Sequence, residues 1–391
     1  MSQPQKITMP SILPPSHTLA ARRKPWHAIL TLDLFISVAN RSIFHPAITF
    51  IAYLCLAAVP PLHHRHPAAL PVLGYTVFLM LVRGAAAVNQ RVTYGVAREV
   101  RWEREVVVVT GGATGLGRCL VEMILLGKPG VKVAVLDVRE ADEEAREWMA
   151  GKVAGVEGRL WWGCIDVRNS AAVRIMQGRI REELGRPTIL INNAAAGVVG
   201  MPLLPNEESA TLTPQDATKT VTVNTLSQFN TLSAFLPDLL RGENGCAIVT
   251  VSSLLAHLSP TRLADYSASK AALSSLHNTL THEIWSHGDA HVRNKAKTIL
   301  VEPGMIGTEL FRHITDVPWY SNFFGPLLEV NEVAKAIIAK LDAGESGVIR
   351  MPFYSKCMPL YAAMPGSMQR AMRWFAGIDQ AIVPSRNKKS Q

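Results

Sequence analysis

The chain has few charged residues and few cysteines for its length. Of its 391 residues, 18% are charged and 48% are hydrophobic, which excludes a largely disordered chain. The cysteines lie far apart and form no C-x-x-C pair, a spacing that excludes a zinc ribbon and a disulfide scaffold. We therefore expect no metal site, and buried free thiols in a reducing compartment, at Cys55, Cys119, Cys164, Cys246 and Cys357.

Internal repeats are also lacking. There is no G-x-y pattern and no period of 20 to 50 residues, which excludes collagen-like and solenoid architectures. The length alone suggests two or three domains and allows a full core without disulfides or metals.

Basic charge is present, but it is concentrated at the two ends. Residues 1–105 hold 11 Lys and Arg against 4 Asp and Glu, and Arg386, Lys388 and Lys389 add three more cations. The intervening residues hold 26 against 27 and are nearly neutral. A nucleic-acid partner is not expected, because such proteins carry their basic stripe on the folded domain. Basic ends beside apolar segments are typical of contact with an anionic membrane surface.

The first hundred residues lack an uninterrupted apolar run of about 20 residues, the length that crosses a bilayer. Three shorter stretches occur instead, at Ala28–Ala39, Ile43–Val59 and Ala68–Val82. They predict one or two spanning helices or a hairpin that enters one leaflet. The alternative is an extra helical layer packed on a soluble body. A cleaved signal peptide is not expected, because the apolar region starts late.

Basic residues follow these stretches directly and would hold the downstream domain on the cytosolic side; they are Arg91, Arg98, Arg101 and Arg104. A histidine cluster at His63, His64 and His66 is interpreted as a solvated loop rather than a metal site.

From Glu105 onward, short apolar strands alternate with helix-length segments, a pattern typical of a parallel sheet covered on both faces. We therefore predict an α/β fold with a Rossmann-like, doubly wound sheet. The predicted strands are Val106–Thr110, Lys132–Asp137, Leu160–Asp166, Thr188–Asn192, Ala247–Ser252, Thr298–Val301 and Gly347–Met351, and clear helices are Leu116–Leu126, Ser170–Leu184 and Ala264–His287.

A glycine-rich turn, Thr110–Gly117, joins the first strand to a helix. Its glycines allow close approach to a pyrophosphate, and the helix N-terminus favours the anion. Asp137 ends the second strand, where a carboxylate accepts from a ribose 2′-hydroxyl and repels a 2′-phosphate. This favours NAD(H), with NADP(H) as the alternative because Arg139 lies nearby. Asp166 ends the third strand. Its carboxylate is expected either to contact the adenine of the cofactor or to act as the N-cap of the next helix.

The chain resembles the short-chain dehydrogenase/reductase family over about residues 105–352, through motifs in the expected order. They are T-G-x-x-x-G-x-G at Thr110–Gly117, N-N-A at Asn192–Ala194, Asn224, Ser253, Y-x-x-x-K at Tyr266–Lys270, and Pro303-Gly304 with Thr308. One departure is that Gly197 comes two residues later than in the usual N-N-A-G.

The resemblance implies an enzyme that acts on CH-OH groups, and the residue chemistry agrees. Tyr266 and Lys270 share a helix face, so the ammonium should lower the phenol pKa and fit Tyr266 for acid and base catalysis. Ser253 would hold the substrate oxygen and Asn224 a water in the proton path. The cofactor-binding set is Thr110, Gly111, Gly115, Leu116, Gly117, Asp137, Asp166, Asn193, Ala194, Tyr266, Lys270, Pro303, Gly304 and Thr308.

The region after Thr308 and the apolar N-terminus suggest a lipophilic substrate. In the family that the chain resembles, the region after Thr308 covers the substrate, which implies an apolar lid here, with core or dimer surface as the alternative. Its aromatic residues are Phe311, Trp319, Tyr320, Phe323 and Phe324. The apolar N-terminus resembles the membrane-attached retinol and 17-beta-hydroxysteroid dehydrogenase branch, which implies a steroid, retinoid or fatty-acyl-derived substrate at the endoplasmic reticulum or lipid droplets. The segment Lys356–Val383 is expected to lie along the membrane.

The expected organisation is a membrane-attachment region at 1–104, the catalytic domain at 105–352 and a basic, amphipathic tail at 353–391. Two alternatives stay open: a non-catalytic lipid-surface or scaffold protein that keeps the fold, and a soluble enzyme with an N-terminal targeting or oligomerisation arm. A homodimer is left open, because no interface signal decides the oligomeric state.

Overall fold

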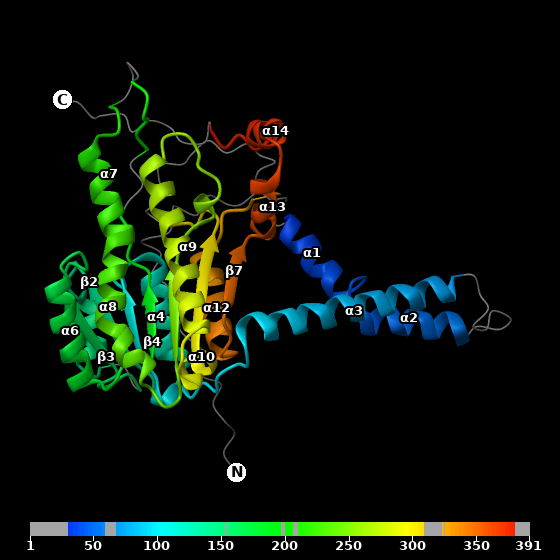
Figure 1. Ribbon diagram of the computed structural model, residues 1–391. Helices are drawn as coiled ribbons and strands as arrows, with labels where there is room; N and C mark the ends of the chain where they lie inside the picture. The colour runs from blue at the N-terminus through cyan, green and yellow to red at the C-terminus, as the bar shows by residue number, and fades with distance from the viewer. Residues whose placement is uncertain are drawn as a thin grey trace, which may run out of the picture.

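A parallel sheet of seven strands forms the centre of the computed structural model (Figure 1), in the order β3-β2-β1-β4-β5-β6-β7. The structure describes residues 30–58, 68–152, 155–196, 200–205, 210–308, 323 and 325–379. The strands are β1 (Val106–Thr110), β2 (Lys132–Asp137), β3 (Leu160–Cys164), β4 (Ile189–Asn192), β5 (Cys246–Val251), β6 (Ala296–Pro303) and β7 (Gly347–Met351).

Helices cover both faces of this sheet. Because side chains alternate along a strand, Val107 and Val109 of β1 pack on one face, and Val106 and Val108 on the other. The first face is covered by α4 (Gly115–Gly127), α5 (Glu143–Met149) and α12 (Val330–Asp342). The second is covered by α6 (Ser170–Glu183), α8 (Ser227–Leu240) and α9 (Ala264–Trp285). The predicted doubly wound fold is confirmed.

The strand order reverses between β1 and β4. In open α/β sheets, ligands bind beyond the carboxyl ends of the strands at such a reversal. Helix α7 (Pro214–Val221) and short turns stand near that edge, whereas α10 (Ala290–Lys295) precedes β6.

Three N-terminal helices lie outside this sheet: α1 (Leu32–Arg41), α2 (Pro46–Ala58) and α3 (Ala69–Tyr94). Helices α2 and α3 form a hairpin that projects away from the body (Figure 1). A hydrogen bond between Thr49 and Thr76 (2.9 Å) joins them, but most apolar side chains of the hairpin are exposed. The alternative of a helical layer packed on the body is therefore wrong for α2 and α3, whereas α1 contacts the body, where Asp33 accepts from the backbone N–H of Phe353 (2.7 Å). Helix α3 is long and apolar enough to cross a membrane, and α1 with α2 passes the same test as a pair bent by 52°.

The base of the hairpin is fixed to the body. Gln90 donates to the carbonyl of Ser346 (2.8 Å), and Lys297 donates to the carbonyl of Tyr94 at the end of α3 (3.4 Å). In the loop that follows, Arg98 forms a buried ion pair with Glu105 (3.1 Å). These contacts set the direction in which the hairpin leaves the sheet.

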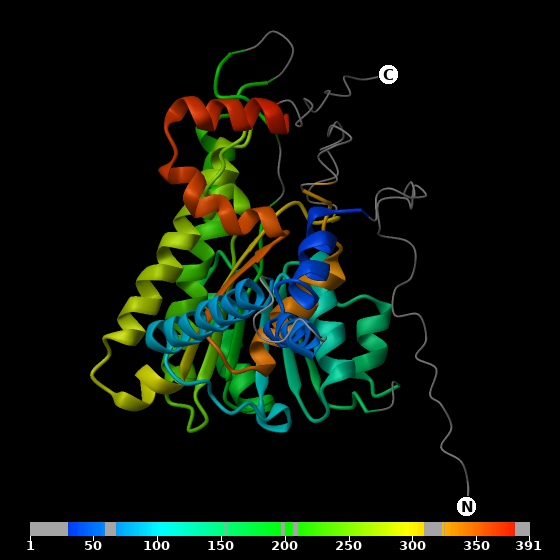
Figure 2. The same ribbon diagram turned by 90° about the vertical axis from the view of Figure 1, so that its right-hand side faces the viewer.

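The C-terminal segment packs beside the edge strand β7. It comprises η6 (Phe353–Cys357), α13 (Met358–Ala363) and α14 (Gly366–Ala376). Helix α14 exposes its apolar side chains Trp374 and Phe375, as expected of an amphipathic helix. In Figure 2 the hairpin points toward the viewer and α14 (red) runs across the same side of the body. Residues 380–391, with the three basic residues of the tail, lie outside the described residues.

The cysteines differ from the expectation in part. All five thiols are free, but only Cys119 and Cys246 are buried, whereas Cys55, Cys164 and Cys357 are exposed. Burial raises the pKa of Cys119 to about 11 and that of Cys246 to about 12, so both buried thiols stay protonated.

Candidate active site

The glycine-rich turn is built around Thr110, the last residue of β1. Its hydroxyl accepts from the backbone N–H groups of Asn193 (3.0 Å) and Ala194 (3.1 Å), and Asn193 donates to the carbonyl of Gly111 (2.9 Å). A Cβ on Gly117 would lie 2.1 Å from that same carbonyl. The turn therefore requires glycine at this position because of close approach rather than backbone conformation.

The N-terminus of α4 can receive an anion. Thr114 occupies the N-cap but makes no side-chain cap hydrogen bond, so the N–H groups of the first turn, which includes Leu116, keep their donor capacity. Gly111 and Gly115 adopt positive φ values of 66° and 57°, which bring the backbone over this helix end. A dinucleotide pyrophosphate fits such a cradle by charge and by shape.

Asp137 lies beside this turn at the end of β2. One carboxylate oxygen accepts from the backbone N–H of Ala113 (2.9 Å), and the other accepts from that of Arg139 (3.0 Å). The carboxylate is thereby held next to the cradle, and each oxygen keeps a lone pair for a further donor.

Asp166 lies beyond the end of β3 and is partly exposed. Arg168 donates to it through Nε (2.7 Å) and through its backbone N–H (2.9 Å). The side-chain hydrogen bond from Arg168 lowers the pKa of Asp166. The interpretation of Asp166 as a helix N-cap is wrong, because Asn169 caps α6 by accepting from Ala171 and Ala172. Two residues separate Asp166 from the N-cap Asn169, and the Asp166 carboxylate accepts hydrogen bonds from Arg168 instead.

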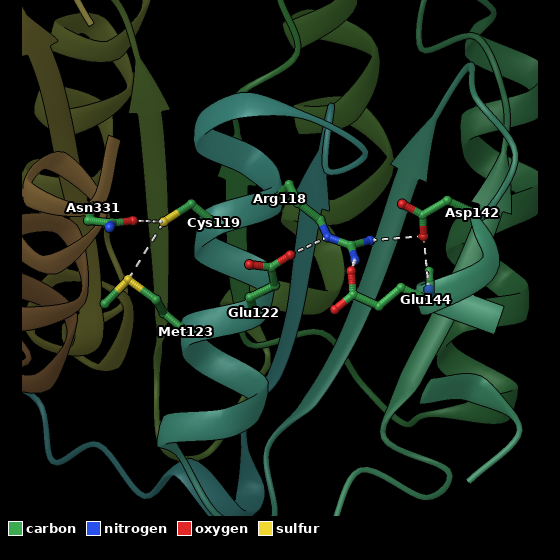
Figure 3. Close-up of polar contacts among 8 residues, drawn as sticks. Arg118, Cys119, Glu122, Met123, Asp142, Glu144 and Asn331 are labelled. Atoms are coloured by element: carbon green, nitrogen blue, oxygen red, sulfur yellow. Dashed lines mark hydrogen bonds and ion pairs between the residues drawn. The ribbon is translucent and has the colours of Figure 1, made fainter. Parts of the chain in front are cut away.

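A charged network holds α4 against the N-terminal end of α5 (Figure 3). Arg118, next to Gly117, contacts Glu122 on its own helix, Glu144 on α5 (2.9 Å) and Asp142 (3.3 Å), the N-cap of α5. Burial raises the pKa of Glu122, while Arg118 opposes this effect. The opposite side of α4 is joined to α12 by Cys119, which donates to Asn331 (3.1 Å).

Ser253, Tyr266 and Lys270 meet at the carboxyl end of β5, and all three are buried. Ser253 begins the turn η4 (Leu254–Ala256) and hydrogen-bonds Tyr266. The Lys270 ammonium lies 5.7 Å from the centre of the Tyr266 ring and donates to the carbonyl of Val251 (2.9 Å). The structure thus brings these three predicted residues together.

The expected lowering of the Tyr266 pKa is wrong for the protein as described. Burial raises the pKa of Tyr266 above its ordinary value of 10, and the hydrogen bond with Ser253 offsets only part of this effect. Burial also lowers the pKa of Lys270 to about 8. Both shifts have one cause, because a dry pocket disfavours the charged form of each group.

Asn224 reaches the same site from η3 (Thr222–Leu226), a π-helical turn between α7 and α8. Its side chain accepts from the backbone N–H of Ala196 (2.7 Å) and donates to Ser269 (3.0 Å). Ser269 in turn donates to the carbonyl of Tyr266 (2.7 Å). Such π-turns often occur at functional sites, and here the turn links the loop after β4 to the helix that carries Tyr266.

Pro303 ends β6, and Gly304 and Thr308 follow it at the same edge of the sheet. The N–H of Gly304 donates to the carbonyl of Met351 (2.7 Å). A Cβ on Gly115 would lie 3.5 Å from Thr308, so Thr308 stands across from the glycine-rich turn. Gly197 and the proposed lid residues Phe311, Trp319, Tyr320 and Phe324 lie outside the described residues. Phe323 contacts Phe35 of α1, with 5.9 Å between ring centres.

The sequence prediction missed Glu302, which lies beneath the site and is 1% exposed. It is contacted by His257 of the turn after η4 (2.9 Å), by Ser274 of α9 (2.9 Å) and by Arg350 of β7 (2.8 Å). Burial opposes ionisation, but the hydrogen bond from His257 and the charge of Arg350 leave the pKa of Glu302 lowered. The only sequence signal was an acidic residue directly after the predicted apolar strand Thr298–Val301.

A family model described as short chain dehydrogenase matches residues 105–318. The chain is 25% identical to the uncharacterized oxidoreductase TDA5 of Saccharomyces cerevisiae, over 78% of this chain and 87% of the relative. It is 30% identical to estradiol 17-beta-dehydrogenase 11 of Homo sapiens, over 60% of this chain and 70% of the relative. A crystal structure of a short chain dehydrogenase from Burkholderia cenocepacia in complex with NADP superimposes with a TM-score of 0.53 and 26% identity, over 71% of this chain and 99% of that chain.

Proposed function

Since this chain belongs to the short-chain dehydrogenase family, we propose that it is an NAD(P)-dependent oxidoreductase that interconverts a lipophilic alcohol and its ketone or aldehyde. The observation that carries the proposal is the buried cluster of Ser253, Tyr266 and Lys270. A phenol that is dry, hydrogen-bonded and near an ammonium is suited to moving a proton to or from a substrate oxygen.

The proposed chemistry assigns one role to each residue. Ser253 holds the substrate oxygen by a hydrogen bond, and Tyr266 takes the hydroxyl proton in oxidation or returns it in reduction. Lys270 favours the phenolate electrostatically, and Asn224 positions the loop after β4 and a water for the proton path. A bound nicotinamide supplies the hydride acceptor or donor.

We propose that the glycine-rich turn and the N-terminus of α4 hold the dinucleotide cofactor. Gly111, Gly115 and Gly117 allow close approach, Leu116 belongs to the helix end that faces the pyrophosphate, and Thr110, Asn193 and Ala194 shape the turn. Asp166, Pro303, Gly304 and Thr308 complete the proposed set, together with Tyr266 and Lys270, which belong to both the catalytic and the cofactor-binding residues. The carboxylate of Asp137 favours NAD(H) over NADP(H), so kcat/KM should be higher with NAD(H).

The exposed hairpin supports attachment to a membrane or lipid-droplet surface, with the body facing the cytosol. Helix α2 has 13 residues and covers about 20 Å, less than the roughly 30 Å of a bilayer core. This length favours a hairpin that enters one leaflet. Relatives named as estradiol and 17-beta-hydroxysteroid dehydrogenases support a steroid or similar lipophilic substrate. The three-part division at residues 104 and 352 belongs to the same proposal.

The decisive experiment compares wild type with Tyr266→Phe in NAD(H)-linked assays over steroids, retinoids and long-chain alcohols and carbonyls. We expect turnover to fall by about 10²- to 10⁴-fold while cofactor binding, measured by fluorescence titration, stays unchanged. Wild type that binds cofactor but turns over no member of the panel would favour the scaffold alternative. Near-normal turnover by the variant would refute the role of Tyr266.

A further inference from the structure

A cavity of about 320 Å³ lies between α1 and the end of β7, outside the proposed catalytic cluster. One wall is a single face of α1, since its polar lining residues recur at helical spacing, namely Asp33, Ser37, Asn40 and Arg41. The opposite wall is formed by β7 and η6, which contribute Arg350, Lys356 and the Met351–Phe353 segment.

The acidic group of this cavity has one satisfied and one unsatisfied oxygen. Oδ1 of Asp33 accepts from the backbone N–H of Phe353 (2.7 Å), which fixes the carboxylate. Oδ2 is buried and has no hydrogen-bond partner within the described part of the chain. A buried carboxylate oxygen without a donor is costly, so a ligand that brings a donor would be stabilised there.

The basic groups of the cavity have spare positive charge. Arg350 is already paired with Glu302 (2.8 Å). Within the part of the chain that the structure describes, neither Arg41 nor Lys356 forms an ion pair with a carboxylate. The Lys356 ammonium lies over the Phe353 ring, 5.5 Å from its centre. The cavity therefore holds two cations that can accept an anion, together with one carboxylate that can accept a donor.

The position of the cavity suggests the source of its ligand. Arg41 ends α1, just before the turn that leads into the apolar helix α2, and Arg83 of α3 donates to the carbonyl of Phe44 in that turn (3.2 Å). Helix α1 lies between the body and the projecting hairpin (Figure 1). If the hairpin enters a leaflet, this level corresponds to the headgroup layer, which is several ångströms thick.

We propose that the cavity binds the headgroup of a phospholipid that carries a primary ammonium, as phosphoethanolamine does. The ammonium donates to Oδ2 of Asp33, and the phosphate contacts Arg41 and Lys356. A choline headgroup has no N–H to donate, so it leaves the Asp33 oxygen unsatisfied. The lipid source rests on the proposed membrane attachment, whereas the chemistry of the site does not.

The test uses the full chain, purified in detergent, and calorimetric titration with soluble headgroups. Glycerophosphoethanolamine should bind roughly tenfold more tightly than glycerophosphocholine or inorganic phosphate, the difference expected for one charge-assisted hydrogen bond. Asp33→Asn should remove the discrimination between the amines. Arg41→Gln with Lys356→Gln should weaken all three ligands, while Arg370→Gln, an exposed cation outside the cavity, should change none.

A second variant keeps the test valid if Asp33→Asn does not fold. Ser37→Phe fills the cavity and removes no charge, so it should abolish headgroup binding at an unchanged melting temperature. Phosphatidylethanolamine should also be enriched over phosphatidylcholine among the lipids retained by wild type in micelles. Equal affinity for both amines, or phosphate binding as tightly as glycerophosphoethanolamine, would overturn the proposal. Membrane sedimentation and dehydrogenase turnover are measured separately, so their failure is distinguishable from loss of this site.

Discussion

At the scale of single residues, Gly117 is the position where one methyl group should matter most. An added Cβ would lie 2.1 Å from the carbonyl of Gly111 and 2.6 Å from the Asn193 amide. We expect Gly117→Ala to lose cofactor binding by fluorescence titration and to unfold at lower denaturant. Gly178→Ala in α6 has no atom within 4 Å of the new Cβ and should gain about 0.5–1 kcal/mol. Cofactor affinity unchanged in Gly117→Ala would show that the turn can open.

His277 gives the stability a defined dependence on pH. It is buried against Thr250, and burial lowers its pKa from 6.5 to about 4. The unfolded chain therefore binds a proton between these two values that the folded chain does not, so stability falls as pH drops from 6.5 toward 4.

In His277→Gln that part of the dependence should disappear. The slope of unfolding free energy against pH, measured by denaturant titration, should be flatter than in wild type by about one proton. Superimposable slopes from pH 6.5 to 4 would mean that His277 is protonated in the folded protein.

At the scale of elements, Arg118 should contribute to the docking of α4 on α5. Its loss leaves Glu122, with 9% of its side chain exposed, without a cation. We expect Arg118→Met to cost about 3 kcal/mol in denaturant unfolding, and the pair Arg118→Met with Glu122→Leu to recover much of it. Arg179 and Glu183 form an ion pair whose side chains are 54% and 47% exposed to solvent. Arg179→Met should therefore lower the free energy of unfolding by less than about 0.5 kcal/mol. Equal losses at both sites would contradict the docking role.

Much of the element pattern follows from local sequence. Each predicted strand is present, because runs such as Val106–Val109 are apolar and β-branched and end at a turn signal. Strand β6 is longer than predicted, since Glu302 and Pro303 continue the pairing with β7. The polar character of Glu302 concealed it, and only Arg350 and His257, distant in sequence, explain why the strand carries it.

The candidate site was predictable where its residues form family motifs at short spacing, as Tyr266 and Lys270 do on one helix. Contacts between remote segments were not. Asp33 and Phe353 meet across 320 positions, and no local pattern couples them. The pKa direction of Tyr266 was also missed, because it depends on how completely the site excludes water.

At the scale of the whole molecule, the hairpin should decide where the protein resides. Phe78 and Leu81 are 58% and 67% exposed on α3. Replacing both with Lys places two charges at the centre of the proposed inserted segment, at a cost of about 2.5–3.5 kcal/mol each. We expect this variant to appear in the supernatant of a high-salt wash, whereas wild type sediments with membranes.

The matched control is Ala86→Lys, an exposed position nearer the body on the same helix, which should leave the protein in the pellet. Wild type released intact by salt alone would exclude integral attachment.

The contacts between the first helices and the last strand also constrain the order of biosynthesis. Gln90 is synthesised 256 positions before its partner Ser346, and Asp33 is synthesised 320 positions before its partner Phe353. At about 5–20 residues per second, Asp33 of α1 is synthesised roughly 16 to 64 s before its partner Phe353. Throughout that interval the apolar hairpin lacks its contacts with the body, and entry into a lipid surface during translation would cover its exposed side chains. The first helices made are therefore among the last to be anchored in the finished fold.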